Sequence, residues 1–321
     1  MAPEKLSNCP ICQTTGMTVV DLPGKTARQQ IAAVFGTNVP DEIEILDYTM
    51  LQCTGCGLVY ANPMIPGGAD YYGWITVQPK YSAGQRWEWE KIATALAQRI
   101  GRTSHSGRAR VLEVGCGNGK LLQFLGANKN LNLSGVDVSA PSVKLAQEKG
   151  LAVRLADFSN PASALGPDEM FDGIILSHVL EHVSDPMGVT RALAARLNNG
   201  GAIFVSVPYS PMSRELDGWD IQNLPPHHLT RWNKNSLARL ASKLGLELSL
   251  ITAKAKSPFK RAVQDTCGRA LGNKHPWLGA RIGAVLGNFK MFVDFYNRHR
   301  DREFVGGKPV GDTALAIFSK K

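Results

Sequence analysis

The stretch Val111-Leu112-Glu113-Val114, followed directly by Gly115-Cys116-Gly117-Asn118-Gly119, decides the fold of this chain of 321 residues. The first four residues are typical of a strand, and the three glycines predict a turn that opens the next helix. Glycine has no Cβ, so at such a turn the backbone can approach a ligand closely at the helix N-terminus. We therefore expect a strand, a turn and a helix that together bind a ligand.

From Arg110 onward the chain alternates between apolar strands and amphipathic helices, which predicts an α/β fold with a parallel sheet covered on both faces. A helix is expected at Ser236–Leu244, where three leucines share one face. The further strands are expected at Leu133–Asp137, Leu151–Leu155, Phe171–Ser177, Ala202–Val207, Leu246–Thr252 and Asp312–Ser319.

The glycine spacing distinguishes between two classes of nucleotide-binding turn. A nicotinamide-binding fingerprint places its third glycine one position later, where Lys120 stands, and needs no acid inside the strand. The pattern Glu113-x-Gly115-x-Gly117-x-Gly119 instead resembles motif I of class I S-adenosylmethionine-dependent methyltransferases. That resemblance implies S-adenosylmethionine as the cofactor and a Rossmann-like sheet of seven strands whose last strand is antiparallel.

Residues after the next three strands support this resemblance, which covers roughly residues 108–207. Asp137 ends the second strand, where a ribose diol needs a bidentate acceptor. Asp157 and Phe158 resemble the position where the family holds the adenine amino group, and residues 178–186 are similar to its motif after the fourth strand. The residues assigned to the cofactor are Glu113, Gly115, Cys116, Gly117, Asn118, Gly119, Asp137, Val138, Asp157, Phe158 and Ser177.

Four of the six cysteines form two C-x-x-C pairs, Cys9-Pro-Ile-Cys12 and Cys53-Thr-Gly-Cys56. Each pair presents two thiolates from one tight turn, and two such turns can close a tetrahedral zinc site. Four cysteine ligands leave no open coordination position, so we expect the zinc to be structural. The alternatives are four incidental reduced thiols or a redox pair.

These patterns divide the chain into three predicted parts. Residues 1–80 form a zinc-binding module and a linker. Residues 81–253 together with 307–321 form the domain that binds S-adenosylmethionine. Residues 254–306 form a basic, helical insertion before the last strand.

A connection of 25 residues, Pro208–Trp232, leaves the fifth strand on the side where such sheets bind ligands. Unstructured connections of this length are usually functional lids. Its segment Pro225-Pro226-His227-His228, together with the cysteine pairs and motif I, resembles a bacterial group of methyltransferases associated with sugar and cell-surface glycan methylation. Relatives of that group include O-methyltransferases of quinone biosynthesis. The resemblance implies methyl transfer to a small-molecule or glycan-type acceptor, such as a sugar or polysaccharide intermediate.

Methyl transfer needs a group that removes a proton from the acceptor, and histidine suits this role near neutral pH. The candidates are His227, His182, His228 and His178. The alternative for His182 is a ring that binds the backbone and fixes its loop, and for His227 and His228 it is packing of the lid. Because successive side chains alternate along an extended backbone, we expect His227 to face the site and His228 to face away.

The net charge of +9 is concentrated near the C-terminal end. Residues 1–250 hold 22 Lys and Arg against 22 Asp and Glu, whereas residues 251–321 hold 14 against 5. This distribution favours a local anionic partner over a general nucleic-acid surface. Residues 277–287, continuing through Phe295, predict an apolar helix with three glycines on one face. It is expected to pack on the catalytic domain, to form a homodimer, or to contact an anionic membrane that carries a lipid-linked substrate.

No apolar run approaches the ~20 residues needed to cross a bilayer. The first residues, MAPEKLSNCPIC, lack the apolar core of a secretory signal. We expect a cytoplasmic protein that contacts at most the inner face of the membrane.

Two other functions compete with the leading one. An RNA methyltransferase would use the cysteine knuckles and the basic segment, but residues 1–80 show no basic cluster. The stretch Ser177-His178-Val179-Leu180 also lacks the Asn/Asp-Pro-Pro-aromatic signature of enzymes that methylate amino groups. A cofactor-binding scaffold without catalysis is disfavoured by the intact glycine motif and Asp137.

Overall fold

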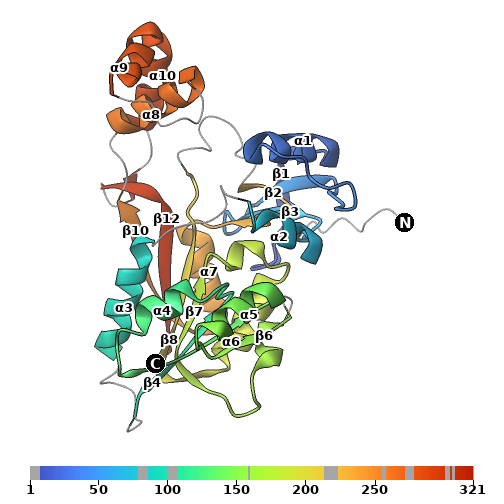
Figure 1. Cartoon of the computed structure of the whole chain (residues 1–321), viewed down its shortest axis with the longest axis vertical. Coiled ribbons are helices and arrows are strands. Elements are labelled where there is room, and N and C mark those ends of the chain that lie inside the picture. Colours follow the sequence, from blue (N-terminus) through green and yellow to red (C-terminus); the bar gives the residue numbers. More distant parts are fainter. Residues whose placement is uncertain are drawn as a thin grey trace.

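Two sheets form the framework of the chain, as Figure 1 shows. The larger sheet has the strand order β10-β12-β8-β7-β4-β5-β6, and the smaller one the order β1-β2-β3-β9. The computed structural model describes residues 8–78, 86–99, 107–157, 160–212, 223–254, 258–271, 278–300, 304–305 and 308–320.

The larger sheet is parallel except for one strand. Strand β4 pairs in parallel with β5 and β7, β5 with β6, and β7 with β8, whereas β12 lies antiparallel between β8 and β10. A short strand, β11, adds to β12. The bounds are β4 (Ala109–Val114), β5 (Leu131–Asp137), β6 (Val153–Leu155), β7 (Phe171–Ser177), β8 (Leu197–Pro208), β10 (Glu247–Lys254), β11 (Phe304–Val305) and β12 (Lys308–Ser319). The expected seven-stranded Rossmann-like sheet with an antiparallel last strand is confirmed.

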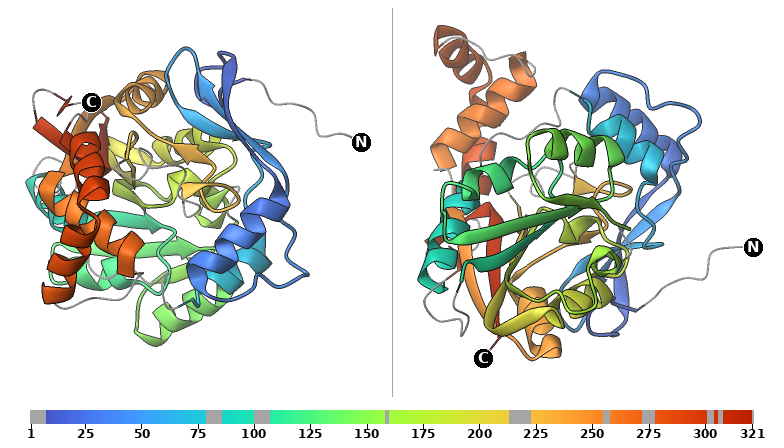
Figure 2. Two further views of the ribbon diagram at one scale, coloured as in Figure 1. Left: turned by 90° about the horizontal axis from the view of Figure 1, so that it is seen from above. Right: turned by 60° about the horizontal axis from the view of Figure 1, so that its bottom comes forward.

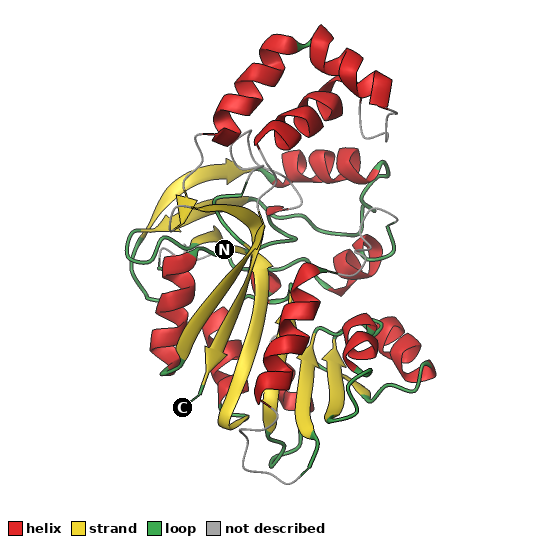
Figure 3. Cartoon of the chain, turned by 90° about the vertical axis from the view of Figure 1, so that its left-hand side faces the viewer, coloured by secondary structure: helices red, strands yellow, loops and turns green. Residues whose placement is uncertain are grey.

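Helices cover both faces of this sheet (Figure 3) because neighbouring residues of a strand point to opposite sides. In β4, Val111 shares an apolar core with α3 and α4, whereas its neighbour Leu112 shares another with α6 and α7. These helices are α3 (Trp87–Arg99), α4 (Lys120–Leu125), α5 (Ala140–Glu148), α6 (Pro186–Ala194) and α7 (Lys234–Leu244), with short 3₁₀ turns η1 (Pro161–Ala164) and η2 (Leu180–His182).

Polar side chains set the starts of three helices. The Ser139 hydroxyl accepts a hydrogen bond from the N–H of Ser142 at the start of α5, and the Asp185 carboxylate accepts one from Gly188 at the start of α6. Asn233 and Ser236 form a reciprocal capping box on α7. Each cap satisfies backbone donors that the first helical turn leaves without a partner.

The smaller sheet is antiparallel and combines three N-terminal strands with one strand from the segment after β8. Tyr60 of β3 pairs with Thr230 of β9, and Val59 with Arg231. One apolar core also runs through both sheets. The N-terminal elements, blue in Figure 2, lie together on one side of the molecule. They are β1 (Gly16–Leu22), α1 (Gly24–Phe35), β2 (Tyr48–Cys53), β3 (Val59–Asn62) and α2 (Ala69–Ile75), joined by β9 (Thr230–Arg231). The division into three parts stays a prediction, and the two sheets are packed as one structure.

The basic segment forms three helices, α8 (Pro258–Leu271), α9 (Leu278–Gly287) and α10 (Phe289–Arg300), which stand apart from the sheet at the top of Figure 1. One helix continuing through Phe295 was expected, and that expectation is wrong. Gly287, a poor helix former, is the last residue of α9, and α10 begins at Phe289. The N–H of Asn288 still bonds to the carbonyl oxygen of Ala284, so the break between the two helices is short. Among the described residues, a Cβ at Gly283 would meet no heavy atom within 4 Å, so no close helix contact is seen at this glycine.

Among the described helices, none combines the length and the apolar composition that a membrane span requires.

Candidate active site

The turn between β4 and α4 holds Gly115, Gly117 and Gly119 at φ values of +70°, +52° and +78°. A Cβ at Gly115 would lie 2.4 Å from Cγ2 of Val179, so only glycine fits there. At Gly117, by contrast, a Cβ would meet no heavy atom within 4 Å. The turn therefore packs tightly against the protein at Gly115 and leaves space for a ligand at Gly117.

The carboxylate of Asp137 lies directly against this turn. Its Oδ2 accepts the N–H of Gly117 at 2.7 Å, and its Oδ1 accepts the N–H of Ser139 at 2.8 Å. Each carboxylate oxygen has a second lone pair, so Asp137 can also accept from ligand hydroxyls. Burial raises the pKa of Asp137, although these N–H groups oppose the shift.

A small pocket opens where β4 and β5 end, and four of the predicted cofactor residues line it: Gly115, Asp137, Val138 and Asp157. The remaining lining residues are mostly apolar and were not predicted individually. Two of them, Val179 and Val183, lie in the motif after β7. The complete lining is Val114, Gly115, Val136, Asp137, Val138, Ala156, Asp157, Pro161, Val179 and Val183.

Other predicted cofactor residues do not line this pocket. The side chain of Cys116 packs in an apolar cluster with α5, because the turn directs it toward the sheet. The Ser177 hydroxyl accepts a hydrogen bond from Ser206 at 3.3 Å, and the Asn118 carbonyl accepts one from the ammonium of Lys149. Phe158 lies outside the described residues.

Glu113 is a buried acid beneath the glycine turn, with 3% of its surface exposed. Its Oε2 has no hydrogen-bond partner among the described residues. Burial, and then the negative charge of Asp137, raises the pKa of Glu113 well above its usual range. A cationic ligand would relieve both effects. S-adenosylmethionine has positive groups and a ribose diol, so the acid pair and the open glycine turn fit it.

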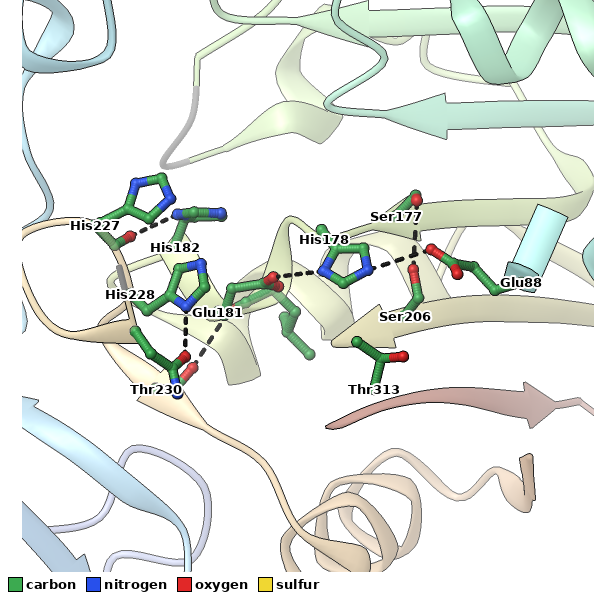
Figure 4. Close-up of polar contacts among 12 residues, drawn as sticks. Glu88, Ser177, His178, Glu181, His182, Ser206, His227, His228, Thr230 and Thr313 are labelled. Carbon is green, nitrogen blue, oxygen red and sulfur yellow. Dashed lines mark hydrogen bonds and ion pairs between the residues drawn. The ribbon is translucent and has the colours of Figure 1, made fainter. Parts of the chain in front are cut away.

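His178, at the end of β7, joins two buried carboxylates (Figure 4). Its Nε2 lies 3.2 Å from Oε1 of Glu88, and its Nδ1 lies 3.2 Å from Oε1 of Glu181. Burial alone would lower the pKa of His178, but the hydrogen bonds to the two carboxylates outweigh it and raise the pKa. Burial opposes ionisation of Glu88 as well, yet the contact with His178 lowers its pKa. The two carboxylates therefore favour the charged form of this candidate base and hold its ring in place.

The other three candidate histidines form one group. The ring centroids of His182 lie 4.7 Å from those of His227 and of His228, and the rings of His227 and His228 are stacked at 4.6 Å. Figure 4 shows this three-histidine group next to Glu181, whose own contacts run to His178 and from there to Glu88. All three residues were predicted as candidate bases from the sequence, and the fold brings them together.

The expectation that His227 and His228 face opposite ways is wrong. Both backbone N–H groups bond to the carbonyl of Leu224 at 3.1 Å, so the chain turns here and is not extended. In such a turn successive side chains lie on the same side, as the interplanar angle of 18° between the two rings shows.

Hydrogen bonds hold two of these rings in place. Nδ1 of His182 lies 2.5 Å from the carbonyl oxygen of His227 and 3.3 Å from the hydroxyl of Tyr72. Nδ1 of His228 lies 2.7 Å from Oδ1 of Asn223. No local pattern selects Tyr72 for this role, because it is 110 residues from His182 along the chain. Asn223 is only five residues from His228, but no motif marked it.

Burial lowers the pKa of each histidine in this group, and the neighbouring rings add to the effect for His227 and His228. Their pKa values therefore shift in the opposite direction to that of His178. The group is neutral near pH 7.

The four cysteines meet between the turns at residues 9–12 and 53–56. Sγ of Cys9 lies 3.7 Å from Sγ of Cys56, and Sγ of Cys12 lies 3.3 Å from Sγ of Cys53. All four sulfur atoms lie within 4.8 Å of one another. A tetrahedral zinc with bonds of 2.3 Å places its sulfurs roughly 3.8 Å apart, so the set fits this metal. The contact with the Cys56 thiol is the main cause that lowers the pKa of Cys9 to about 5.

A family model described as a methyltransferase domain matches residues 88–250, just over half of the chain. The chain belongs to this family. The match agrees with the sheet order and with the glycine turn, and it confirms the S-adenosylmethionine-dependent methyltransferase family expected from the motif.

Two curated relatives of this methyltransferase are named "Ubiquinone biosynthesis O-methyltransferase". The protein from Idiomarina loihiensis is 32% identical over 127 residues, which are 38% of this chain and 50% of the relative. The protein from Ralstonia nicotianae is 36% identical over 101 residues, which are 30% of this chain and 42% of the relative. The chain thus spans half or less of these relatives.

Among solved structures, an S-adenosylmethionine-dependent methyltransferase from Archaeoglobus fulgidus is 17% identical. The likeness covers 78% of this chain and all of that one, with a TM-score of 0.49. It adds nothing to the sheet order described above.

The link between Glu88 and His178 predicts how the stability of this methyltransferase depends on pH. The pKa of His178 is raised above 6.5, so its contribution is complete below pH 6.5 and is lost as the pH rises through the folded-state value. The pKa of Glu88 is lowered below 4.5, so its contribution is present above pH 4.5. Glu88→Gln should therefore cost about 3 kcal/mol of unfolding free energy at pH 6 and clearly less at pH 9, measured by urea denaturation.

Glu90→Gln is the matched control, because Glu90 is exposed on the same helix. It should change the free energy of unfolding by less than about 0.5 kcal/mol at either pH. An equal loss for Glu88→Gln at pH 6 and pH 9 would show that the charge on His178 is not involved.

Proposed function

We propose that this protein transfers the methyl group of S-adenosylmethionine to a hydroxyl of a small-molecule or glycan-type acceptor. One observation carries the proposal. Val179 and Val183 line the cofactor pocket, and His182 lies between them in the turn η2, in contact with His227 and His228. The loop after β7 therefore contributes both to the wall of the pocket and, through His182, to the three-histidine group.

The acceptor class rests on chemistry and on similarity. A neutral imidazole suits the deprotonation of a hydroxyl, and the relatives named above are O-methyltransferases. The four-cysteine module and the Pro-His segment favour a sugar or polysaccharide intermediate. The quinone-type relatives support a phenolic small molecule as the other member of the same class.

Different residues of the chain would bind different parts of the cofactor and the acceptor. Bound S-adenosylmethionine supplies an electrophilic methyl group on a sulfonium. Asp137 would accept from the ribose hydroxyls, and Gly117 would leave room for the ligand. A bound cation would favour the ionised form of Glu113, which would then balance positive charge. The three-histidine group would activate the acceptor hydroxyl in line with the methyl group, where alignment supplies much of the rate.

Asp137→Ala tests the cofactor site. The variant removes the acceptor for two ribose hydroxyls, which is worth about 1–3 kcal/mol, so the affinity for S-adenosylmethionine should fall about tenfold or more. Isothermal titration calorimetry measures this directly.

Asp168→Ala makes the same change at an exposed loop residue and should bind normally. Unchanged affinity in Asp137→Ala, with circular dichroism like that of the native protein, would remove Asp137 from the cofactor site.

The second part of the proposal is a structural zinc held by Cys9, Cys12, Cys53 and Cys56. The sulfur distances support it, and so do backbone N–H groups that point at the thiolates, such as that of Ile11 toward Cys9 at 3.4 Å. The cysteine turns lie at one end of the smaller sheet, so the metal would stabilise the module and take no part in methyl transfer.

Cys53→Ser should lower the zinc content from one ion per chain to less than about 0.2 and lower the unfolding temperature by about 5 °C or more. Elemental analysis and calorimetry measure the two effects. Cys267→Ser, at a buried cysteine outside the cluster, should keep the zinc. Native protein prepared without chelator and free of zinc would contradict the assignment.

His227 is the first residue of the three-histidine group to test. His227→Ala should lower turnover by about 100-fold and leave the affinity for S-adenosylmethionine nearly unchanged, because the pocket lining does not include this side chain. The assay uses labelled S-adenosylmethionine with a panel of nucleotide sugars, lipid-linked glycans and quinone precursors.

If His227→Ala keeps full turnover and His182→Ala loses activity, the group that removes the proton lies in the loop after β7 and is not His227. Native protein that binds the cofactor but methylates none of the panel would favour the scaffold function.

Helices α8–α10 remain our proposed contact with an anionic membrane. Phe259, Leu286 and Phe289 are each more than half exposed, within a segment of net positive charge. Such a surface suits anionic headgroups, and a second copy of the chain is the alternative partner.

A further inference from the structure

Hydrogen bonds to neighbouring oxygen atoms determine the tautomer of two rings of the three-histidine group, those of His182 and His228. Nδ1 of His182 faces the carbonyl oxygen of His227 at 2.5 Å, and Nδ1 of His228 faces Oδ1 of Asn223 at 2.7 Å. These oxygens only accept hydrogen bonds, so Nδ1 carries the hydrogen in both rings. In the neutral ring Nε2 then keeps a free lone pair. Histidine ligands of metal ions show this arrangement, with one ring nitrogen held by an outer oxygen and the other on the metal.

The third ring completes a convergent set of nitrogen atoms. One ring nitrogen each of His182, His227 and His228 lies within 4.8 Å of the other two. Bonds of 2.0–2.1 Å to a tetrahedral ion place nitrogen ligands roughly 3.3 Å apart. Binding of an ion therefore requires the side chains to rotate so that these nitrogen atoms come closer together. Figure 4 shows the rings gathered at one place from the turn η2 and from the segment before β9.

We propose that His182, His227 and His228 bind a divalent transition-metal ion, with zinc as the expected metal. Three imidazole nitrogens without a carboxylate suit zinc, nickel or copper and exclude calcium and magnesium, which prefer oxygen ligands. The four-cysteine site is closed, whereas three histidines leave one coordination position open. The chain would thus hold two zinc ions of different kinds.

The role of this second ion rests on the proposed function, but its binding does not. An acceptor hydroxyl at the open position would bind the metal through oxygen, and the metal would lower the pKa of that hydroxyl. The O–H bond breaks with its proton passing to water, the new O–C bond forms, and the S–C bond of the donor breaks to leave S-adenosylhomocysteine. Without the ion, His227 would accept the proton itself.

Cobalt(II) titration tests the site in the full-length protein after its cysteine site has been filled with zinc. The native protein should bind one further equivalent of cobalt, and its visible spectrum should lack the thiolate charge-transfer bands of cysteine-bound cobalt. The double variant His182→Ala/His228→Ala should lose this equivalent and keep the zinc.

Asn223→Ala provides the second variant, because it keeps all three ligands and removes the oxygen that orients His228, together with the amide contact to Sδ of Met212. Its cobalt affinity should fall by about 10-fold to 100-fold. This variant keeps the test valid if the double variant fails to fold. Cys267→Ser is the control that should bind cobalt as the native protein does.

Three outcomes decide the matter. No second equivalent in folded native protein, or a second equivalent that the histidine and Asn223 variants bind equally well, overturns the metal site. If cobalt binding depends on the histidines but turnover is unaffected when a chelator removes only the second ion, the metal site is supported and the role of the ion in catalysis is overturned. Histidine-dependent binding in a protein that methylates no acceptor supports the site and contradicts the proposed function.

Discussion

Leu229 donates its backbone N–H to the carbonyl of Glu181 at 2.7 Å and accepts the N–H of Ala61 at 2.8 Å. Its side chain is wholly buried, so both backbone groups need these partners. The two bonds tie the loop after β7 to the N-terminal sheet through the segment that carries His227 and His228. The positions of the three histidines relative to one another depend on this connection, because His182 lies on one side of it and the other two lie next to it in the chain.

The pKa values of two histidines only four residues apart, His178 and His182, are shifted in opposite directions. His178 lies between two carboxylates, which raise its pKa, whereas burial is the largest effect on His182 and lowers the pKa of that ring. Burial acts in the same direction on both rings, so the difference comes from the charge of the nearest groups. One loop thus carries a histidine whose charged form is favoured by two carboxylates and a second histidine whose neutral form is favoured by burial.

The larger sheet could be predicted from sequence because its strands are apolar runs separated by capped helices, signals that lie within about ten residues. The glycine motif and Asp137 were predictable for the same reason. The contacts of His178 with Glu88 and of His182 with Tyr72 join residues far apart in the chain, and no local pattern marks them. The stacking of His227 on His228 was missed because the sequence does not show that Leu224 accepts from both N–H groups. The break between α9 and α10, next to Gly287, was also missed.

Strand β9 completes the smaller sheet with two residues that follow the end of β3 by 168 positions. During synthesis at roughly 5–20 residues per second, β3 would wait about 10 to 30 s for this partner. The N-terminal strands therefore leave the ribosome with an unprotected edge, and most of the chain must emerge before that edge is covered. A bound metal in the cysteine turns would hold the unfinished sheet together during this interval.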